Sequence, residues 1–377
     1  MKLNRLRLRG FRNFEEATVD FAEGINVISG RNAQGKTNLL EAVYILSGGR
    51  SFRTRFDREL IRFDQNDAEL TADIYAGDRE QRIELLLRRG LPKRILQNGV
   101  KKTGLELGET VQTVLFSPED LELIRAGAAS RRRLLDLAIS QLRPGYGKLL
   151  ADYNRLWENK LRLLRDYRDN PRMLDTLEVY SDAMARLSAK LIRYRSSFAQ
   201  RLNAAAAPIH RDFAAGGSGG KDEELGVVYR TVSTVTDCTA SEQTIYGQIL
   251  EHQRQHSAAE LAAGSCLTGI HKDDLEITVN GRSARSFASQ GQTRTAALSL
   301  KLAEREIFLQ ETGEAPILLL DDVLSELDAF RQEFVLNRIG GGQTMITCCE
   351  DEQIVKKTGG TVLFVENGTV HPDRGRE

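Results

Sequence analysis

The chain has 377 residues, of which 41% are hydrophobic and 28% charged, and it carries no formal net charge; this is the composition of a folded globular protein with two or three domains. It contains no run of ~18 apolar residues, the minimum for a membrane helix, and its first residues lack the apolar core of a secretion signal. The four cysteines and five histidines follow no metal-binding spacing, so we expect reduced thiols, a cytoplasmic location and no zinc site.

The N-terminal segment predicts three strands. Leu3–Leu8 alternates between apolar and polar residues, and Ala17–Phe21 predicts a partner strand after a turn. The short apolar run Ile25–Ser29 is typical of a buried strand. Asn38–Leu46 then has a helical pattern that ends at a glycine pair.

Between that strand and that helix lies a match to G-x-x-x-x-G-K-[ST], the phosphate-binding loop. Its glycines let backbone N–H groups converge on phosphate oxygens at the start of a helix. A chance match in a glycine turn is the alternative, and the flanking strand and helix disfavour it. The predicted nucleotide-binding residues are Gly30, Arg31, Asn32, Ala33, Gln34, Gly35, Lys36, for the β- and γ-phosphates, and Thr37, for Mg²⁺.

An arginine-rich stretch, Arg50–Arg58, follows the helix. Further on, Ala68–Tyr75 and Gln81–Leu87 alternate as strands do, and Asn98-Gly99 is a hairpin signal. These segments predict an antiparallel sheet beside the phosphate-loop core. We therefore assign residues 1–130 to the N-terminal part of a head domain.

Residues 131–264 are predicted to form a helical arm. A heptad stripe runs from Leu177 to Phe198, and a less regular stripe from Leu149 to Tyr167, which Lys160 is expected to interrupt, precedes it. The segment around Asp169-Asn170-Pro171 should be the turn of a short antiparallel coiled-coil hairpin, and Pro208 should end the second helix.

In the segment 125–212, Lys and Arg outnumber Asp and Glu two to one, which indicates a polyanionic partner or a solvated helical surface. The arginines at 131, 132 and 133, which begin the arm, are expected to form a second polyanion-binding cluster in addition to those at 50, 53, 55 and 58. Pairing of these arginines with nearby acids such as Asp57, Glu59 and Asp136 is the alternative.

Residues 265–377 return to an α/β pattern and are assigned to the C-terminal part of the head. Strands are expected at Asp274–Val279, Pro316–Leu320, Gln343–Cys348 and Thr361–Val365, with a helix at Thr293–Leu309. Shorter elements in the middle of the chain are a strand at 227–235 and a helix at 241–263.

Two features of this last part complete a nucleotide site. The apolar strand before Asp321 and Asp322 is typical of the second phosphate-loop motif, in which Asp321 would order Mg²⁺ and Asp322 would lie beside the attacking water. An apolar strand followed by an acidic helix cap is the alternative reading. Ser289-Gln290-Gly291-Gln292 opens a long helix and predicts a second anion site.

In this order the motifs resemble those of ATP-binding-cassette ATPases, in the branch of chromosome maintenance and recombination. The resemblance covers the whole chain, and the short arm is similar to that of the bacterial recombination mediators. It implies an α/β fold, with a cassette-type phosphate-loop head, a flanking antiparallel sheet and a helical arm. Further segments that carry it are Phe11–Phe14, Gly49–Arg53, Phe116–Leu121, Arg131–Asp136 and His271–Leu275.

The resemblance also implies an ATP-dependent homodimer that binds DNA at single-strand gaps and, with RecR and RecO, helps to load a recombinase during repair. ATP would be clamped between the phosphate loop of one subunit and Ser289, Gly291 and Gln292 of the other. Arg12 would touch the ATP phosphates by similarity to related cassettes. No membrane is involved.

This sequence departs from the cassette pattern at several positions. Asp322 replaces the glutamate base of many cassettes, and its shorter side chain suggests a weak, DNA-stimulated ATPase used as a switch. Gln112 is a weak candidate for the glutamine lid, and His271 is more typical of a structural histidine. A transporter-type subunit and a chromosome-organising ATPase are the alternatives; the missing switch histidine disfavours the first and the short arm the second.

Overall fold

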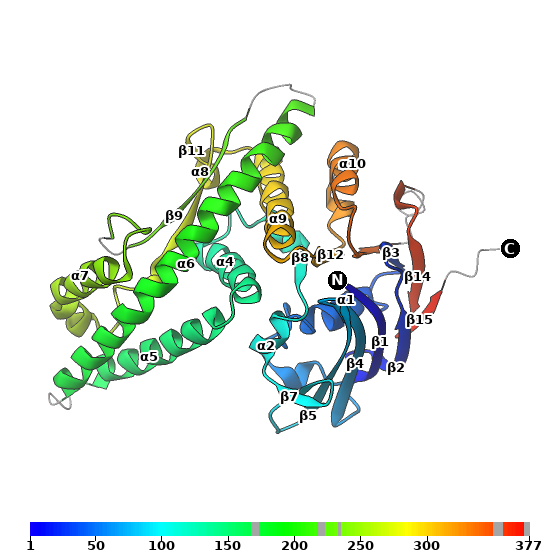
Figure 1. Cartoon of the computed structure of the whole chain (residues 1–377), viewed down its shortest axis with the longest axis horizontal. Coiled ribbons are helices and arrows are strands. Elements are labelled where there is room, and N and C mark those ends of the chain that lie inside the picture. The colour runs from blue at the N-terminus through cyan, green and yellow to red at the C-terminus, as the bar shows by residue number, and fades with distance from the viewer. Residues whose placement is uncertain (167–172, 217–222, 233–234, 350–356, 373–377) are drawn as a thin grey trace. The chain divides into compact units, whose positions relative to one another are not determined.

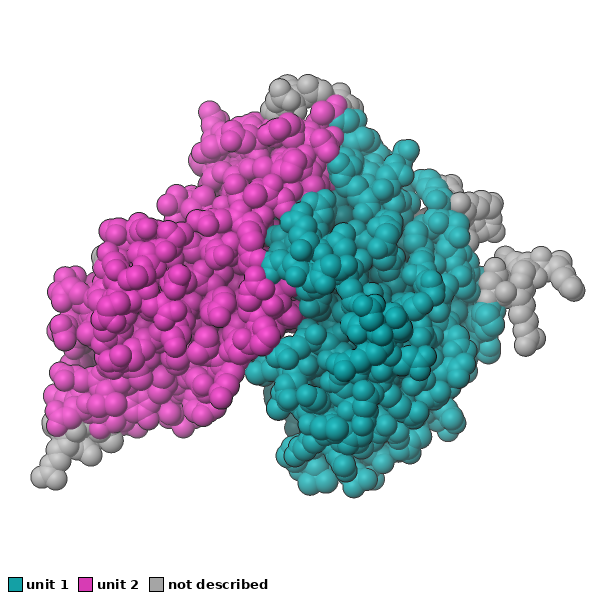
Figure 2. All heavy atoms as spheres, in the orientation of Figure 1, with its two compact units in different colours: residues 1–121, 216–220, 297–377 teal, residues 122–215, 221–296 magenta. Residues whose placement is uncertain are grey.

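The computed structural model describes residues 1–166, 173–216, 223–232, 235–349 and 357–372. The chain forms two compact units, coloured in Figure 2. Unit 1 contains residues 1–121, 216–220 and 297–377, and unit 2 contains residues 122–215 and 221–296. The sequence grouped residues 265–296 with the head, whereas here they cluster with the arm, because strand β10 (Asp274–Val279) pairs along its whole length with β9 (Leu225–Arg230).

Unit 1 contains an antiparallel sheet in the order β2-β1-β4-β5-β6-β7. The turn between its last two strands has Asn98 at φ 51° and Gly99 at φ 79°, the left-handed pair that a two-residue hairpin requires. The antiparallel sheet expected beside the phosphate loop is thus confirmed. Its strands are β1 (Lys2–Phe11), β2 (Phe14–Asp20), β4 (Asp67–Ala76), β5 (Arg79–Arg88), β6 (Arg94–Gln97) and β7 (Val100–Lys102).

A second sheet of unit 1 has the order β15-β14-β3-β13-β12-β8, and all of its neighbouring strands are parallel except β14 and β15. The sequence did not predict its two edge strands, which have four residues each. The strands are β3 (Ile25–Ser29), β8 (Thr113–Phe116), β12 (Ile317–Asp321), β13 (Thr344–Cys348), β14 (Thr361–Glu366) and β15 (Thr369–Pro372).

Helix α1 (Lys36–Ile45) lies in the core that joins the two sheets (Figure 1). One buried cluster contains Leu6 and Leu70 of the antiparallel sheet, Leu39 of α1, and Ile28 of the parallel sheet. Both sheets therefore fix the helix that begins at the phosphate loop. The other helices and turns of unit 1 are η1 (Asp57–Glu59), α2 (Gly104–Gly108), α3 (Pro118–Leu121), η3 (Leu324–Glu326) and α10 (Ala329–Arg338), together with most of α9 (Gln290–Thr312).

Unit 2 is the helical arm, with a small antiparallel sheet in the order β11-β10-β9. Figure 1 shows two of its helices, α5 (Tyr146–Asp166) and the 44-residue α6 (Met173–Gly216). The stripe predicted on α6 is confirmed at Leu177, Met184, Leu191 and Phe198, which are buried. The other elements are α4 (Ala128–Leu142), α7 (Glu242–Ala263), η2 (Ile270–Lys272), β11 (Arg282–Ser283) and α8 (Ala284–Phe287). The expected turn at 169–171 lies outside the described residues.

Two expectations for the arm are wrong. Pro208 does not end α6, which continues to Gly216. A proline removes one backbone hydrogen bond, but Ile209, His210 and Phe213 are buried beyond it, and their packing holds the last turns in helical form. On α5, Lys160 does not interrupt the buried face, because its ammonium group pairs with the buried Glu260 at 2.7 Å. None of the helices in the described ranges is long and apolar enough to cross a membrane.

Candidate nucleotide-binding site

The candidate site is built where parallel strands of unit 1 end. β3 ends at Ser29, which pairs with Cys348 of β13, and Asp321 at the end of β12 pairs with Thr347. The loop 30–35 follows β3 and leads directly into α1. The carboxyl ends of parallel strands and the N-terminus of a helix therefore meet here, which is the place where α/β sheets bind phosphate groups.

Two glycines of the loop are required by their surroundings. A Cβ atom at Gly30 would lie 2.3 Å from the carbonyl oxygen of Val365, and one at Gly35 would lie 2.6 Å from the Asn13 side chain. Both have positive φ angles. Ala33 also has a positive φ, 64°, a conformation that costs a non-glycine residue ~1 kcal/mol or more. The loop therefore packs closely against Val365 and Asn13, and a side chain at either glycine would displace it.

Lys36 is buried at the start of α1. Its Nζ donates to the carbonyl oxygens of Gly30 at 2.6 Å and Arg31 at 2.9 Å, and it lies 3.6 Å from Sγ of Cys349. The exposed thiol of Cys349 also donates to Oδ1 of Asn32 at 2.8 Å. The ammonium group is thus held within the loop, where its charge can act on phosphate oxygens.

Thr37 and Asp321 come from motifs 284 residues apart and are in direct contact. Oγ1 of Thr37 donates to Oδ1 of Asp321 at 3.0 Å, and the hydroxyl of Thr347 donates to the same oxygen at 2.9 Å. Burial raises the pKa of Asp321 above its ordinary value, although the two hydrogen bonds work against the shift. A hydroxyl and a buried carboxylate are hard oxygen ligands that suit Mg²⁺, and a cation here would offset the burial of the carboxylate.

Asp322 directly follows this carboxylate and has an unusual backbone. Its φ is 52°, and its N–H donates to Oγ1 of Thr347 at 2.8 Å. Oγ of Ser325 donates to its carboxylate at 3.1 Å. Left-handed backbone angles cost free energy in a non-glycine residue, and residues with such strain are concentrated at functional sites. The backbone therefore turns Asp322 away from the direction that an extended strand would give it.

The predicted signature lies in unit 2, at the N-terminus of α9. The backbone N–H of Ser289 donates to Oε1 of Gln292 at 2.9 Å, and the N–H of Gln292 donates to Oγ of Ser289 at 3.2 Å. This reciprocal cap fixes the first turn of the helix. Nε2 of Gln292 also donates to Glu223 at 2.7 Å. Ser289 is exposed, so its hydroxyl is accessible from solvent.

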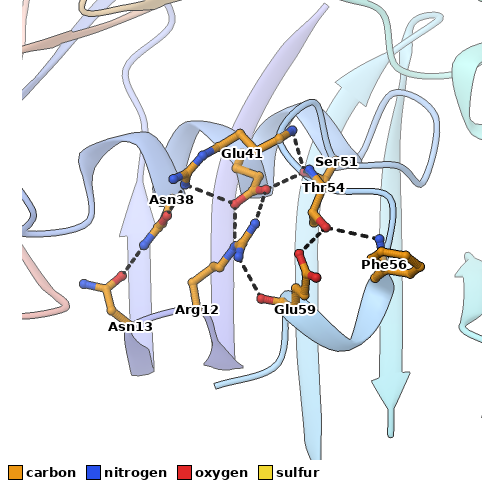
Figure 3. Close-up of polar contacts among 9 residues, drawn as sticks. Arg12, Asn13, Asn38, Glu41, Ser51, Thr54, Phe56 and Glu59 are labelled. Atoms are coloured by element: carbon orange, nitrogen blue, oxygen red, sulfur yellow. Dashed lines mark hydrogen bonds and ion pairs between the residues drawn. The ribbon is translucent and has the colours of Figure 1, made fainter. Parts of the chain in front are cut away.

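Arg12, the remaining predicted phosphate contact, is held by a carboxylate in this structure. Its Nε and Nη2 donate to the two oxygens of Glu41 at 2.8 and 2.7 Å, and Nη1 donates to the carbonyl oxygen of Glu59 at 2.8 Å (Figure 3). An interaction with ATP phosphates stays a prediction for this residue.

The two arginine clusters differ. Arg50, Arg53, Arg55 and Arg58 are exposed on unit 1. Arg131, by contrast, is buried, and its guanidinium pairs with Asp274 at 2.8 and 2.9 Å. Its expected membership of a polyanion-binding cluster is therefore wrong. Arg132 is partly buried and donates to the carbonyl oxygen of Asp273, whereas Arg133 is exposed.

Two other candidates are structural. Nδ1 of His271 lies 3.0 Å from the hydroxyl of the buried Tyr153, and burial lowers the histidine pKa to about 4. Gln112 directly precedes β8, so it lies at the amino ends of the parallel strands, opposite the phosphate loop, and cannot serve as a lid. Thr347 was not predicted as a partner of Asp321, although its place near the end of a neighbouring parallel strand was an available signal.

Comparison with known proteins agrees with this geometry. Residues 2–370 match the family described as "RecF/RecN/SMC N terminal domain". The chain is 37% identical to the DNA replication and repair protein RecF of Acetivibrio thermocellus, over 97% of this chain and 98% of that protein. It is 36% identical to RecF of Bacillus cereus over the full length of both.

Comparison with solved structures also finds a RecF protein among the similar structures. The structure described as "the recombination mediator protein RecF-ATPrS in RecFOR pathway" matches with a TM-score of 0.90 and 34% identity, over 98% of each chain. The Smc head domain of Pyrococcus furiosus matches with a TM-score of 0.55 at 14% identity, over 98% of this chain and 95% of that one. At this low identity, the similarity to the Smc head domain shows a shared fold and nothing more.

Proposed function

This chain belongs to the RecF family of the RecF/RecN/SMC group, and from this premise we propose that it is an ATP-dependent DNA-binding protein of recombinational repair and replication. The observation that carries the proposal is the 3.0 Å hydrogen bond between Thr37 and Asp321. It joins the phosphate loop to the second motif within one unit. A RecF structure described as an ATP complex, 34% identical to this chain, supports ATP as the ligand.

The phosphate loop, residues 30–37, is proposed to hold the ATP phosphates through backbone N–H groups and the ammonium group of Lys36. Thr37 and Asp321 would hold Mg²⁺, which would neutralise charge on the phosphate oxygens. Asp322 would orient the attacking water. Because the side chain of aspartate is one methylene shorter than that of glutamate, we expect slow ATP hydrolysis, which would end the ATP-bound state.

The signature is proposed to act on the ATP of a second copy of the chain. Ser289, Gly291 and Gln292 lie at the N-terminus of the 23-residue α9, where the helix dipole and the first N–H groups favour a negatively charged ligand. Binding of one ATP by two subunits would make dimerisation depend on ATP. The short arm and the full-length likeness to RecF favour this role over that of a transporter subunit or a chromosome-organising ATPase.

DNA is proposed to bind the exposed arginines of unit 1, Arg50, Arg53, Arg55 and Arg58. Arginines attract phosphates without reading base sequence. The protein should therefore distinguish duplex, single-stranded and gapped DNA by their structure and not by their sequence. RecR and RecO are the protein partners expected from the family, and the location is cytoplasmic.

The proposal is tested by measuring DNA affinity with ATP and with ADP, on duplex, single-stranded and gapped DNA across a salt series. We expect tighter binding with ATP and a steep decrease with salt. Equal affinity in both nucleotide states on all three substrates would contradict ATP-controlled DNA binding.

A further inference from the structure

Glu41 lies at the centre of a polar network that the nucleotide site does not require. It is on α1, one helical turn after Thr37, and its side chain is fully buried. The two guanidinium bonds from Arg12 are joined by one from Oγ of Ser51 at 2.5 Å (Figure 3). A buried carboxylate is stable only when it is paired and hydrogen-bonded, so these partners must stay in place while the unit is folded.

The partners of Glu41 hold both ends of the segment 51–59, which we call the arginine loop. At its start, Oγ of Ser51 accepts from the backbone N–H groups of Arg53 at 2.9 Å and Thr54 at 3.0 Å. At its end, the Arg12 side chain donates to the carbonyl oxygen of Glu59 at 2.8 Å. One carboxylate thus closes a loop that carries three exposed arginines, Arg53, Arg55 and Arg58.

Contacts within the loop make it a defined structure. The hydroxyl of Thr54 donates to the carboxylate of Glu59 and accepts from the N–H of Phe56 at 3.1 Å. The guanidinium of Arg58 lies 5.0 Å from the centre of the Phe56 ring. The positions of the exposed arginines therefore depend on how the two ends of the loop are held.

A second path joins the arginine loop to the phosphate loop. Nη1 of Arg53 donates to Oδ1 of Asn38 at 2.7 Å, and Nδ2 of Asn38 donates to Oδ1 of Asn13 at 2.8 Å. Nδ2 of Asn13 donates in turn to the carbonyl oxygen of Gln34 at 2.7 Å. Arg53 also lies 3.8 Å from the carboxylate of Glu41. Three consecutive hydrogen bonds thus connect the loop that would hold phosphate to the loop that would hold DNA.

We infer that Glu41 is a positioning residue that couples nucleotide binding at the phosphate loop to the DNA affinity of the arginine loop. The inference rests on the proposed function. Phosphate binding changes the surroundings of Gln34 and the first turn of α1, and the Asn13–Asn38–Arg53 bonds and Glu41 carry that change to the arginines. Since coupling between two sites is reciprocal, DNA must raise ATP affinity by the same factor as ATP raises DNA affinity.

The test separates coupling from the two binding events. Ser51→Ala removes the hydroxyl that ties the loop to Glu41, Ser51→Thr keeps a hydroxyl, and Glu41→Gln keeps the shape but removes the charge. For each variant, DNA affinity is measured with a slowly hydrolysed ATP analogue and with ADP, and nucleotide affinity is measured without DNA.

In the wild-type chain we expect the ATP analogue to raise DNA affinity ~10-fold, within the usual range of coupling. Ser51→Ala and Glu41→Gln should reduce this ratio to less than ~2, while DNA-free nucleotide affinity changes by less than ~2-fold. Ser51→Thr should restore the ratio, which a general loss of stability would not allow. Glu69→Gln is the matched control, because it breaks the exposed Arg9–Glu69 pair at 3.2 Å on the antiparallel sheet.

Each outcome has a distinct meaning. A ratio near 1 in the wild-type chain contradicts the proposed function itself. If Ser51→Ala and Glu41→Gln both keep the wild-type ratio of DNA affinities with the ATP analogue and with ADP, the inference alone is overturned. An equal loss of this ratio in the Glu69→Gln control overturns it as well. If Glu41→Gln does not fold, the comparison of Ser51→Ala with Ser51→Thr decides.

Discussion

The hydroxyl of Thr37 donates a 3.0 Å hydrogen bond to Asp321, although 284 residues separate them in the chain. This contact exists because β3 and β12 are both parallel neighbours of β13, so the residues that follow them meet at one edge of the sheet. It places a hydroxyl and a carboxylate together beside the ammonium-bearing loop.

Nucleotide binding should protect Cys349 from alkylation. Its exposed thiol lies 3.6 Å from Nζ of Lys36, so phosphates held by this lysine should block access of a maleimide. At ATP concentrations far above the Kd, alkylation should slow by ~10-fold or more, measured by peptide mass spectrometry. The half-buried Cys238 of unit 2 is the internal control, and unchanged labelling of Cys349 would place ATP elsewhere.

Asp322→Asn should keep ATP binding and slow hydrolysis by ~100-fold, because a positioned general base contributes at least that much. The amide retains the acceptor for Ser325 and similar volume, so the backbone at this left-handed residue should be preserved. Single-turnover hydrolysis and ATP affinity are measured together. An unchanged turnover rate would assign the water-orienting role to another residue.

Ser289→Arg should prevent dimerisation while leaving the ATP affinity of the monomer within ~2-fold of wild type. The bulky cation occupies the N-terminus of α9, where the partner's γ-phosphate is expected, and it opposes the helix dipole. Equilibrium nucleotide binding at low protein concentration provides the comparison. A parallel loss of monomer binding would mean that the signature acts on its own subunit's ATP.

Replacing Arg50 and Arg55 with alanine should weaken DNA binding and reduce its salt dependence. The slope of log affinity against log salt should become shallower by roughly 0.9 for each arginine that contacts a phosphate. Arg55 belongs to the arginine loop, and Arg50 directly precedes it. Arg79→Ala with Arg94→Ala, also exposed on unit 1, is the control pair, and an equal effect of both pairs would argue against a defined DNA surface.

Local patterns predicted much of the fold. The expected strands Ile25–Ser29 and Asp274–Val279 coincide with β3 and β10, because a short apolar run and a strict alternation each suit one kind of strand. The tight loop between β3 and α1 was also predictable, since its motif is contiguous in the sequence; phosphate binding by this loop stays a prediction. The edge strands β8 and β15 were not, because four residues carry too little pattern.

Features decided by distant partners were missed. Arg131 was expected in a polyanion-binding cluster, but it pairs with Asp274, 143 residues away. Lys160 seemed to break a buried stripe, but Glu260 neutralises it. Pro208 was expected to stop a helix that packing continues. In each case tertiary contacts override a local rule, and a single sequence does not reveal which contacts form.

The most direct test of the account is sedimentation velocity of the chain with ATP and Mg²⁺, with ADP and Mg²⁺, and with ATP after removal of Mg²⁺. Lys36→Ala is the matched negative control, because it removes the charge that acts on the β- and γ-phosphates. The account predicts a dimer with ATP and Mg²⁺ for the wild-type chain and a monomer in every other case. A mass that is the same with ATP and with ADP, or a dimer of Lys36→Ala at saturating ATP, would contradict it.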